Sequence, residues 1–130
     1  MAVGILIVSH PGVGAPLLAV ARRLLGGLPL ATEAFEAEWD RDSDALLPAA
    51  SAALRKVDGG DGVLILVDLY GATPSRLAEK LSRLGTPSHR ISGLSLPMLL
   101  RVQNYPEQDL DELCRTAAAG ARNGVVINDA

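Results

Sequence analysis

Short aliphatic runs alternate along the chain with longer segments in which apolar residues recur every three or four positions. A short run bounded by turn residues is typical of a buried β-strand, and the wider spacing is typical of an amphipathic helix. Strands that alternate with helices favour an α/β fold with a parallel sheet. The pattern therefore predicts a doubly wound, mostly parallel sheet.

Four strands are expected in this sheet. Val3–Ser9 and Val63–Val67 are apolar at almost every position, which is typical of strands covered on both faces. Leu30–Trp39 alternates loosely and is expected as an edge strand, and His89–Leu94 as a short fourth strand. Val125–Ile127 is expected as a last strand that is too short to nucleate a sheet.

Helices are expected between these strands. They are predicted from Ala15 to Gly26, from the Asp40–Asp44 turn to Val57, from Thr73 to Gly85, from Leu96 to Leu100, and from Pro106 to Arg122. Thr73 is expected to cap the third helix, with Pro74 in its first turn. The inward residues of the first helix are expected to be Leu17, Val20, Ala21, Leu24 and Leu25.

The order of the strands decides which loops meet. Right-handed crossovers with four strands favour the order 2-1-3-4, which puts the first and third strands side by side. Ligands of open parallel sheets bind at the carboxyl ends of such a pair. His10 follows the first strand and Asp68 follows the third. We therefore expect these two side chains to lie close together.

A histidine beside an aspartate is a familiar chemical unit. The carboxylate holds the proton of one ring nitrogen and leaves the other nitrogen free as a nucleophile or base. Gly71, Ala72 and Thr73 stand at a predicted helix start, where N–H groups and a hydroxyl favour a phosphoryl group. Nucleophile, orienting group and anion site are thus expected in one place.

Each of these residues also has a simpler interpretation. His10 can be a polar strand end without chemistry, Asp68 can cap a turn, and Thr73-Pro74 is fully explained by helix capping. The glycine-rich loop is not a Walker motif, because no Lys-Ser/Thr follows Gly14.

Other residues of possible chemical interest are assigned to the surface or the core. His89 lies in the polar segment 86–90 and is expected at the surface. Cys114 lies on an apolar helix face and is expected in the core. Trp39 is expected to serve packing or an interface.

The composition narrows the functional classes. The 130 residues are expected to form one domain, residues 1–130, with 48% hydrophobic and 3% aromatic residues. A net charge of -3 without basic clusters argues against nucleic acid or anionic lipid as partners. One cysteine excludes an internal disulfide and a cysteine-based metal cage. No cofactor or metal is expected.

The first apolar run is too short to span a membrane and lacks a basic flank, so a cytoplasmic location is expected.

Three separated stretches carry a family resemblance. They are Ile5–His10, Gly62–Asp68 with Gly71–Pro74, and Ile91–Leu99. In this order, and over nearly the whole chain, they resemble the mannose-type IIA component of the bacterial phosphoenolpyruvate-dependent sugar phosphotransferase system.

The resemblance implies a phosphotransferase that works through phosphohistidine. His10 would accept a phosphoryl group from an HPr-type carrier and pass it to a IIB partner, or act as a phosphorylation-dependent regulator. Asp68 would be the hydrogen-bond partner of the ring, and Gly71, Ala72 and Thr73 would form the phosphate loop. The last strand would be exchanged within a homodimer. Contact with the membrane would be only indirect, through a permease.

The chain departs from the family pattern at three places. Pro11 stands where the family usually has glycine, Gly71-Ala72-Thr73-Pro74 where it has Gly-Gly-Ser-Pro, and Ser95 where it has asparagine. Three alternatives also remain open at this stage. They are the phosphocarrier subunit of dihydroxyacetone kinase, a small-ligand module of flavodoxin type, and an interaction domain without phosphorylation.

Overall fold

Nine helices and strands are defined in a computed structural model that describes residues 2–129. They are β1 (Gly4–Ser9), α1 (Gly14–Leu25), β2 (Thr32–Glu36), α2 (Ser43–Val57), β3 (Val63–Val67), α3 (Thr73–Leu81), β4 (Ser88–Ser92), α4 (Leu96–Gln103) and α5 (Leu110–Asn123).

All four strands form one parallel sheet in the order β2-β1-β3-β4. Ile7 of β1 lies opposite Ala34 of β2 on one side and Leu66 of β3 on the other. The predicted fold class and strand order are therefore confirmed. The carboxyl ends of β1 and β3 are neighbours, as the sequence predicted.

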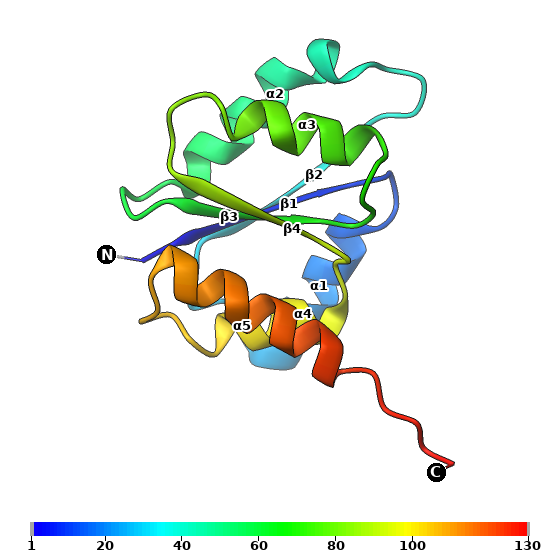
Figure 1. Cartoon of the computed structure of the whole chain (residues 1–130), viewed down its shortest axis with the longest axis vertical. Coiled ribbons are helices and arrows are strands. Elements are labelled where there is room, and N and C mark those ends of the chain that lie inside the picture. The colour runs from blue at the N-terminus through cyan, green and yellow to red at the C-terminus, as the bar shows by residue number, and fades with distance from the viewer. Residues whose placement is uncertain (1, 130) are drawn as a thin grey trace.

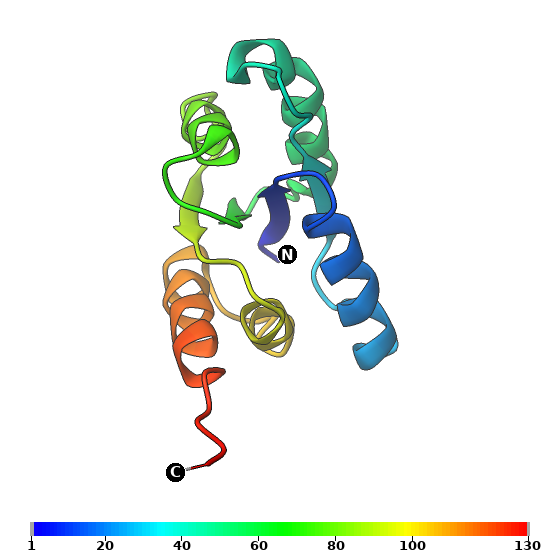
Figure 2. The same cartoon turned by 90° about the vertical axis from the view of Figure 1, so that its right-hand side faces the viewer.

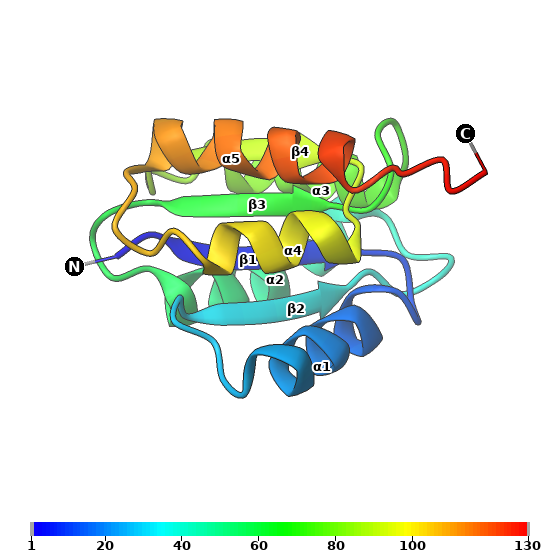
Figure 3. The ribbon, with the colours of Figure 1, turned by 90° about the horizontal axis from the view of Figure 1, so that it is seen from below.

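Helices cover both faces of the sheet and make a three-layer molecule (Figures 1 and 2). α2 and α3 cover one face, and α1, α4 and α5 cover the other, where α4 lies between α5 and α1 (Figure 3). Alternate residues of β1 divide between two cores. Leu6 and Val8 pack with α2 and α3, whereas Ile5 and Ile7 pack with the other three helices. This two-sided burial explains why β1 and β3 are continuous apolar runs.

The first residue of α1, Gly14, lies in close contact with the end of β1. A Cβ atom on Gly14 would lie 2.8 Å from both Ser9 Oγ and Ile7 Cγ2, so a larger residue would push the helix away. The short loop between β1 and α1 is thus held tightly at the point where His10 stands.

The structure corrects several predicted boundaries. β2 is limited to Thr32–Glu36, and β4 begins at Ser88 and ends at Ser92. α3 ends at Leu81, so Leu84 is exposed rather than inward. α5 begins at Leu110 instead of near Pro106, because Asp109 and Glu112 form a capping box that fixes its first turn.

The inward face of α1 was also predicted wrongly in part. Leu18 and Ala21 are its buried apolar residues, whereas Val20 and Leu24 are exposed. α1 packs beside the edge strand β2 and against α4. It therefore buries a narrower stripe than a helix over the centre of a sheet would.

The predicted last strand is not formed within one chain. α5 ends at Asn123, and Val125, Val126 and Ile127 follow without regular structure and with exposed side chains. Figure 1 shows this tail projecting away from the three layers. A strand needs a neighbouring strand to take its hydrogen bonds, and among residues 2–129 the tail pairs with none.

Within residues 2–129, no helix is both long and apolar enough to cross a bilayer.

Candidate functional site

The predicted site residues gather at the carboxyl edge of the sheet, which faces the viewer in Figure 2. Three loops meet there, following β1, β2 and β3. The first carries His10, the second carries Trp39, and the third carries Asp68 and the start of α3.

Asp68 holds His10 through two hydrogen bonds to a single carboxylate oxygen. Asp68 Oδ2 accepts the backbone N–H of His10 at 2.9 Å, and it lies 2.8 Å from Nδ1 of the same residue. The His10 side chain is 23% exposed and that of Asp68 only 10%. The carboxylate is thus largely enclosed, while the ring still reaches solvent.

This arrangement selects one form of the imidazole. An ionised carboxylate can only accept hydrogen bonds, so Nδ1 must carry the proton that it donates to Asp68. In the neutral ring, Nε2 then holds the free lone pair. The second oxygen, Asp68 Oδ1, is buried and has no hydrogen-bond partner among residues 2–129. Asp68 therefore orients the His10 ring and leaves the lone pair of Nε2 free.

Two further side chains hold the loop that carries His10. Ser9 Oγ accepts the N–H of Gly14 at 2.9 Å. Glu36, at the end of β2, accepts the N–H of Gly12 at 3.1 Å and that of Ala15 at 3.0 Å. These bonds satisfy free N–H groups at the start of α1, as a capping side chain would.

Sequence reasoning missed this role of Glu36. Its partners are backbone groups more than twenty residues away, and an N–H group leaves no mark in a sequence. Three glutamates alternate in this segment, at positions 33, 36 and 38. Only the knowledge that β2 ends beside the β1–α1 loop could have singled out Glu36.

The predicted phosphate loop forms the start of α3. Gly71 has a φ of 88°, a left-handed conformation that glycine adopts without strain. Ala72, and not Thr73, occupies the N-cap position, so the predicted cap was wrong by one residue. Alanine has no side-chain acceptor, and no side chain caps this helix. Thr73 Oγ1 instead lies 3.3 Å from Arg76 Nη2.

Large exposed side chains surround the His–Asp pair. Trp39 is 65% exposed, and its ring centroid lies 5.3 Å from that of His10 with a tilt of 35°. Leu69 and Tyr70, directly after Asp68, are also exposed. The two loops that flank β1 thus place apolar surface on both sides of the site.

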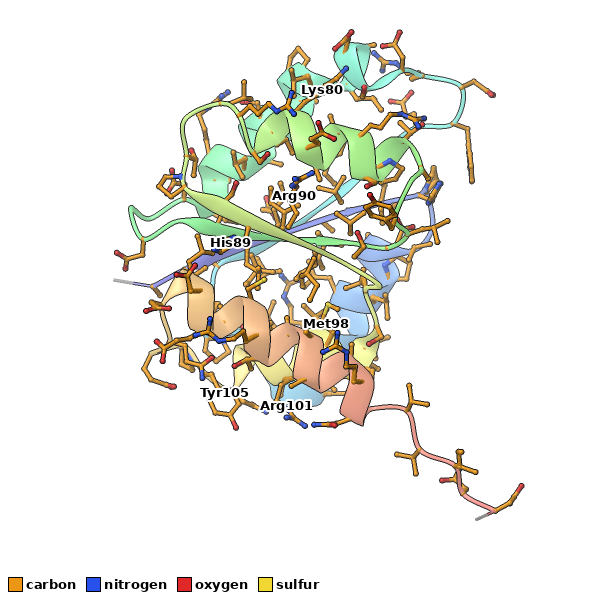
Figure 4. All side chains as sticks on the ribbon, viewed as in Figure 1. Lys80, His89, Arg90, Met98, Arg101 and Tyr105 are labelled. Atoms are coloured by element: carbon orange, nitrogen blue, oxygen red, sulfur yellow. The ribbon has the colours of Figure 1, made fainter. Side chains whose placement is uncertain are left out.

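The remaining predicted residues lie elsewhere. His89 is exposed on β4 and contacts Asp111 of α5, while its neighbour Arg90 lines a groove beneath α3 (Figure 4). Cys114 is half-buried and packs against the core under α5. Burial, together with the nearby charge of Asp111, raises the pKa of the Cys114 thiol. Within residues 2–129, no three His, Cys, Asp or Glu side chains gather as metal ligands would.

Several known proteins are similar to this chain in sequence or in fold. The family model EIIA-man, described as PTS system fructose IIA component, matches residues 4–117. The chain is 30% identical over 132 residues to the PTS system mannose-specific EIIAB component of Escherichia coli strain K12. That alignment covers 96% of this chain but 39% of the relative, so the chain spans about two fifths of the relative's length.

Two solved structures have the same fold at lower identity. The mannose/sorbose specific IIA subunit of the phosphotransferase system from Enterococcus faecalis superposes with a TM-score of 0.87 at 22% identity, covering 100% of this chain and 97% of that one. Phosphotransferase system component EIIA from Streptococcus agalactiae gives 0.83 at 22% identity, covering 98% of each chain. The family match over most of the chain shows that it belongs to the mannose-type IIA components of the sugar phosphotransferase system.

Proposed function

We propose that this chain is a histidine phosphocarrier in which Nε2 of His10 receives and passes on a phosphoryl group. One observation carries the proposal: Asp68 Oδ2 lies 2.8 Å from Nδ1 and so leaves Nε2 free. Membership of the IIA family supports a role in phosphoryl transfer.

The transfer itself needs no metal or cofactor from this chain. The lone pair on Nε2 attacks the phosphorus of a phosphohistidine on an HPr-type donor. The donor's N–P bond breaks, and its electron pair stays on the donor ring. His10 then carries the phosphoryl group on Nε2 and keeps its Nδ1 proton on Asp68, so its ring is formally positive. In the second transfer, a nucleophile of the acceptor attacks the same phosphorus. The N–P bond at Nε2 breaks, its electron pair stays on the ring, and His10 returns to its neutral form.

The N-terminus of α3 is the proposed binding site for the transferred phosphoryl group. Helix N-termini attract anions through their free N–H groups and their dipole. At α1 these groups are taken by Glu36 and Ser9. α3 follows directly after the Asp68 loop and has no side-chain cap. Gly71, Ala72 and Thr73 would therefore receive the phosphoryl oxygens.

Partner proteins would dock on the apolar surface around His10. Trp39, Leu69 and Tyr70 are exposed there, and large aromatic residues are frequent anchors of protein interfaces. An HPr-type carrier as donor and a IIB component or a regulatory target as acceptor would use this surface in turn. This function places the protein in the cytoplasm, in contact with the membrane only through a permease.

The unpaired edge of the sheet supports a homodimer. β4 is an edge strand, and the groove of about 920 Å³ between β4 and α3 includes Tyr70, Arg76 and Arg90. An unpaired strand edge readily takes a strand from another chain. The exposed apolar tail, Val125–Ile127, supplies such a strand. Two copies would exchange their tails, each pairing with β4 of the other.

The direct test is phosphorylation with purified components. The chain is incubated with ³²P-phosphoenolpyruvate, enzyme I and HPr, and a separate IIB domain is then added. We expect label that is acid-labile and alkali-stable on His10, followed by its transfer to IIB.

Matched variants separate this carrier from other functions. His10→Gln should abolish the label, and His89→Gln should leave it unchanged, because His89 lies on the exposed edge strand. No label on the wild-type chain, or label that persists in His10→Gln, would refute the proposal. Label that reaches a dihydroxyacetone kinase subunit but not IIB would reassign the acceptor.

A further inference from the structure

We propose that Trp39 is a positioning residue for His10, whose indole packs beside the imidazole and stabilises the ring in its positively charged, phosphorylated state. The inference rests on the proposed phosphocarrier function and concerns the same site. It starts from the contact between the two rings, whose centroids are 5.3 Å apart.

Burial does not explain where Trp39 stands. The side chain is 65% exposed and belongs to neither apolar core. The indole therefore presents apolar surface to solvent beside the His–Asp pair. Its nearest aromatic ring is that of the nucleophile.

The backbone holds Trp39 in this position from both sides. Before it, the N–H of Ala37 donates to the carbonyl of Ser9 at 2.8 Å, which ties the end of β2 to the residue preceding His10. After it, Asp40 has a φ of 62°, the only positive φ of a non-glycine residue among residues 2–129. Such conformations cost energy and cluster at functional sites. The bend at Asp40 turns the chain away directly after the indole.

The charge of the ring gives this contact a chemical effect. With a phosphoryl group on Nε2 and a proton on Nδ1, the imidazole is cationic, and a cation over an aromatic face is stabilised. When the phosphoryl group leaves, the electron pair of the N–P bond returns to Nε2 and the ring becomes neutral. Trp39 therefore stabilises the loaded state more than the departing one. Loss of the indole should speed spontaneous hydrolysis by about two- to fivefold, the size of an exposed cation–π contact.

The first experiment measures the lifetime of phosphohistidine. All variants carry His89→Gln, because phosphoramidate would also react with that exposed imidazole. His10 is phosphorylated chemically with phosphoramidate, so that no carrier protein is needed, and release of inorganic phosphate is followed. Trp39→Phe keeps a weaker π-face, Trp39→Leu keeps apolar bulk without one, and Tyr105→Ala removes an aromatic ring between α4 and α5 as a control. We expect hydrolysis to be slowest in the wild type and in Tyr105→Ala, faster in Trp39→Phe, and fastest in Trp39→Leu. A wild-type lifetime in Trp39→Leu would overturn the proposal.

The second experiment uses Trp39 as its own probe, because it is the only tryptophan of the sequence. A protonated imidazole quenches a neighbouring indole, so the emission should fall as His10 gains its proton. Several other charged groups flank the two rings. Asp68 lies at Nδ1, Glu36 holds the His10 loop, Glu38 pairs with Arg41, and Asp40 directly follows Trp39. The pH-dependent change should vanish in His10→Gln and persist in His89→Gln. Emission that is independent of pH in the wild type would also overturn the proposal.

The two proposals can fail separately. If HPr labels His10 but the Trp39 variants keep the wild-type lifetime, only the role of Trp39 is wrong. If HPr gives no label while chemically loaded variants follow the expected order, the carrier function fails and the ring contact stands.

Discussion

Asp68 binds the backbone and the side chain of His10 with the same oxygen. Its Oδ2 atom lies 2.9 Å from the His10 backbone nitrogen and 2.8 Å from Nδ1. The backbone bond fixes the carboxylate relative to the end of β1, and the second bond fixes the ring relative to the carboxylate. The orientation and tautomer of the His10 ring thus depend on one side chain that follows β3.

Asp68→Asn should slow phosphoryl uptake by roughly ten- to a thousandfold, as loss of an orienting partner does. The amide is the same size but uncharged, and its NH₂ group can donate to Nδ1, which would favour a proton on Nε2. Circular dichroism should show an intact fold. Asp111→Asn, which changes the carboxylate beside His89, is the matched control and should transfer normally. Equal uptake rates in Asp68→Asn and the wild type would show that the pair has no catalytic role.

Glu36→Gln tests the support of the His10 loop. The wild-type carboxylate accepts two N–H groups with its two oxygens, whereas an amide offers one acceptor and turns a donor toward the other N–H. We expect a loss of about 1 kcal/mol in the free energy of unfolding, comparable to the loss of a helix cap. Phosphoryl uptake should slow with it. Urea titration and a single-turnover labelling assay measure the two effects.

A neighbouring residue provides the control for Glu36. Glu33 lies on the same strand and pairs at 3.7 Å with Lys56 at the surface. Exposed ion pairs contribute little to stability, so Glu33→Gln should change the free energy of unfolding by less than about 0.5 kcal/mol. If both variants behaved alike, the two N–H bonds of Glu36 would not hold the loop.

Cys114 should react slowly with alkylating agents. Burial raises the pKa of its thiol, Asp111 raises it further, and Arg115 lowers it only in part. The thiolate is the reactive form, and a raised pKa leaves less of it at a given pH. At pH 8 we expect iodoacetamide to react more slowly with Cys114 than with glutathione, and faster as the pH rises. A rate equal to that of glutathione would contradict this environment.

The sequence was sufficient for the strand order and for the meeting of His10 with Asp68. β1 and β3 are buried on both faces, so each is a nearly continuous apolar run, and His10 and Asp68 follow directly after them. Once such strands are recognised, chirality rules leave few possible sheet orders. The position of each polar residue at a strand end then places it at the site.

Other features could not be predicted because they depend on contacts between distant parts of the chain. Trp39 lies beside His10 because β2 ends beside β1 and because Asp40 bends the backbone, and neither feature has a local pattern. Val125–Ile127 has the composition of a strand, but its conformation depends on a neighbour outside its own segment. A local pattern predicts the tendency of a segment to form a strand. Which strand it pairs with depends on residues outside that segment.

Removal of residues 124–130 should convert the proposed dimer into a monomer. The exposed tail would otherwise pair with β4 of a second copy, and without it the edge of each sheet stays open. Light scattering at micromolar concentration should give twice the 13.6 kDa chain mass for the full chain and a single chain mass for the truncated one. Val126→Asp places a charge in the middle of the exchanged segment and should have the same effect, whereas Asp129→Asn, near the end of the tail, should remain dimeric. A full-length chain that scatters as a monomer would exclude the exchange, because the tail would then have no partner in solution.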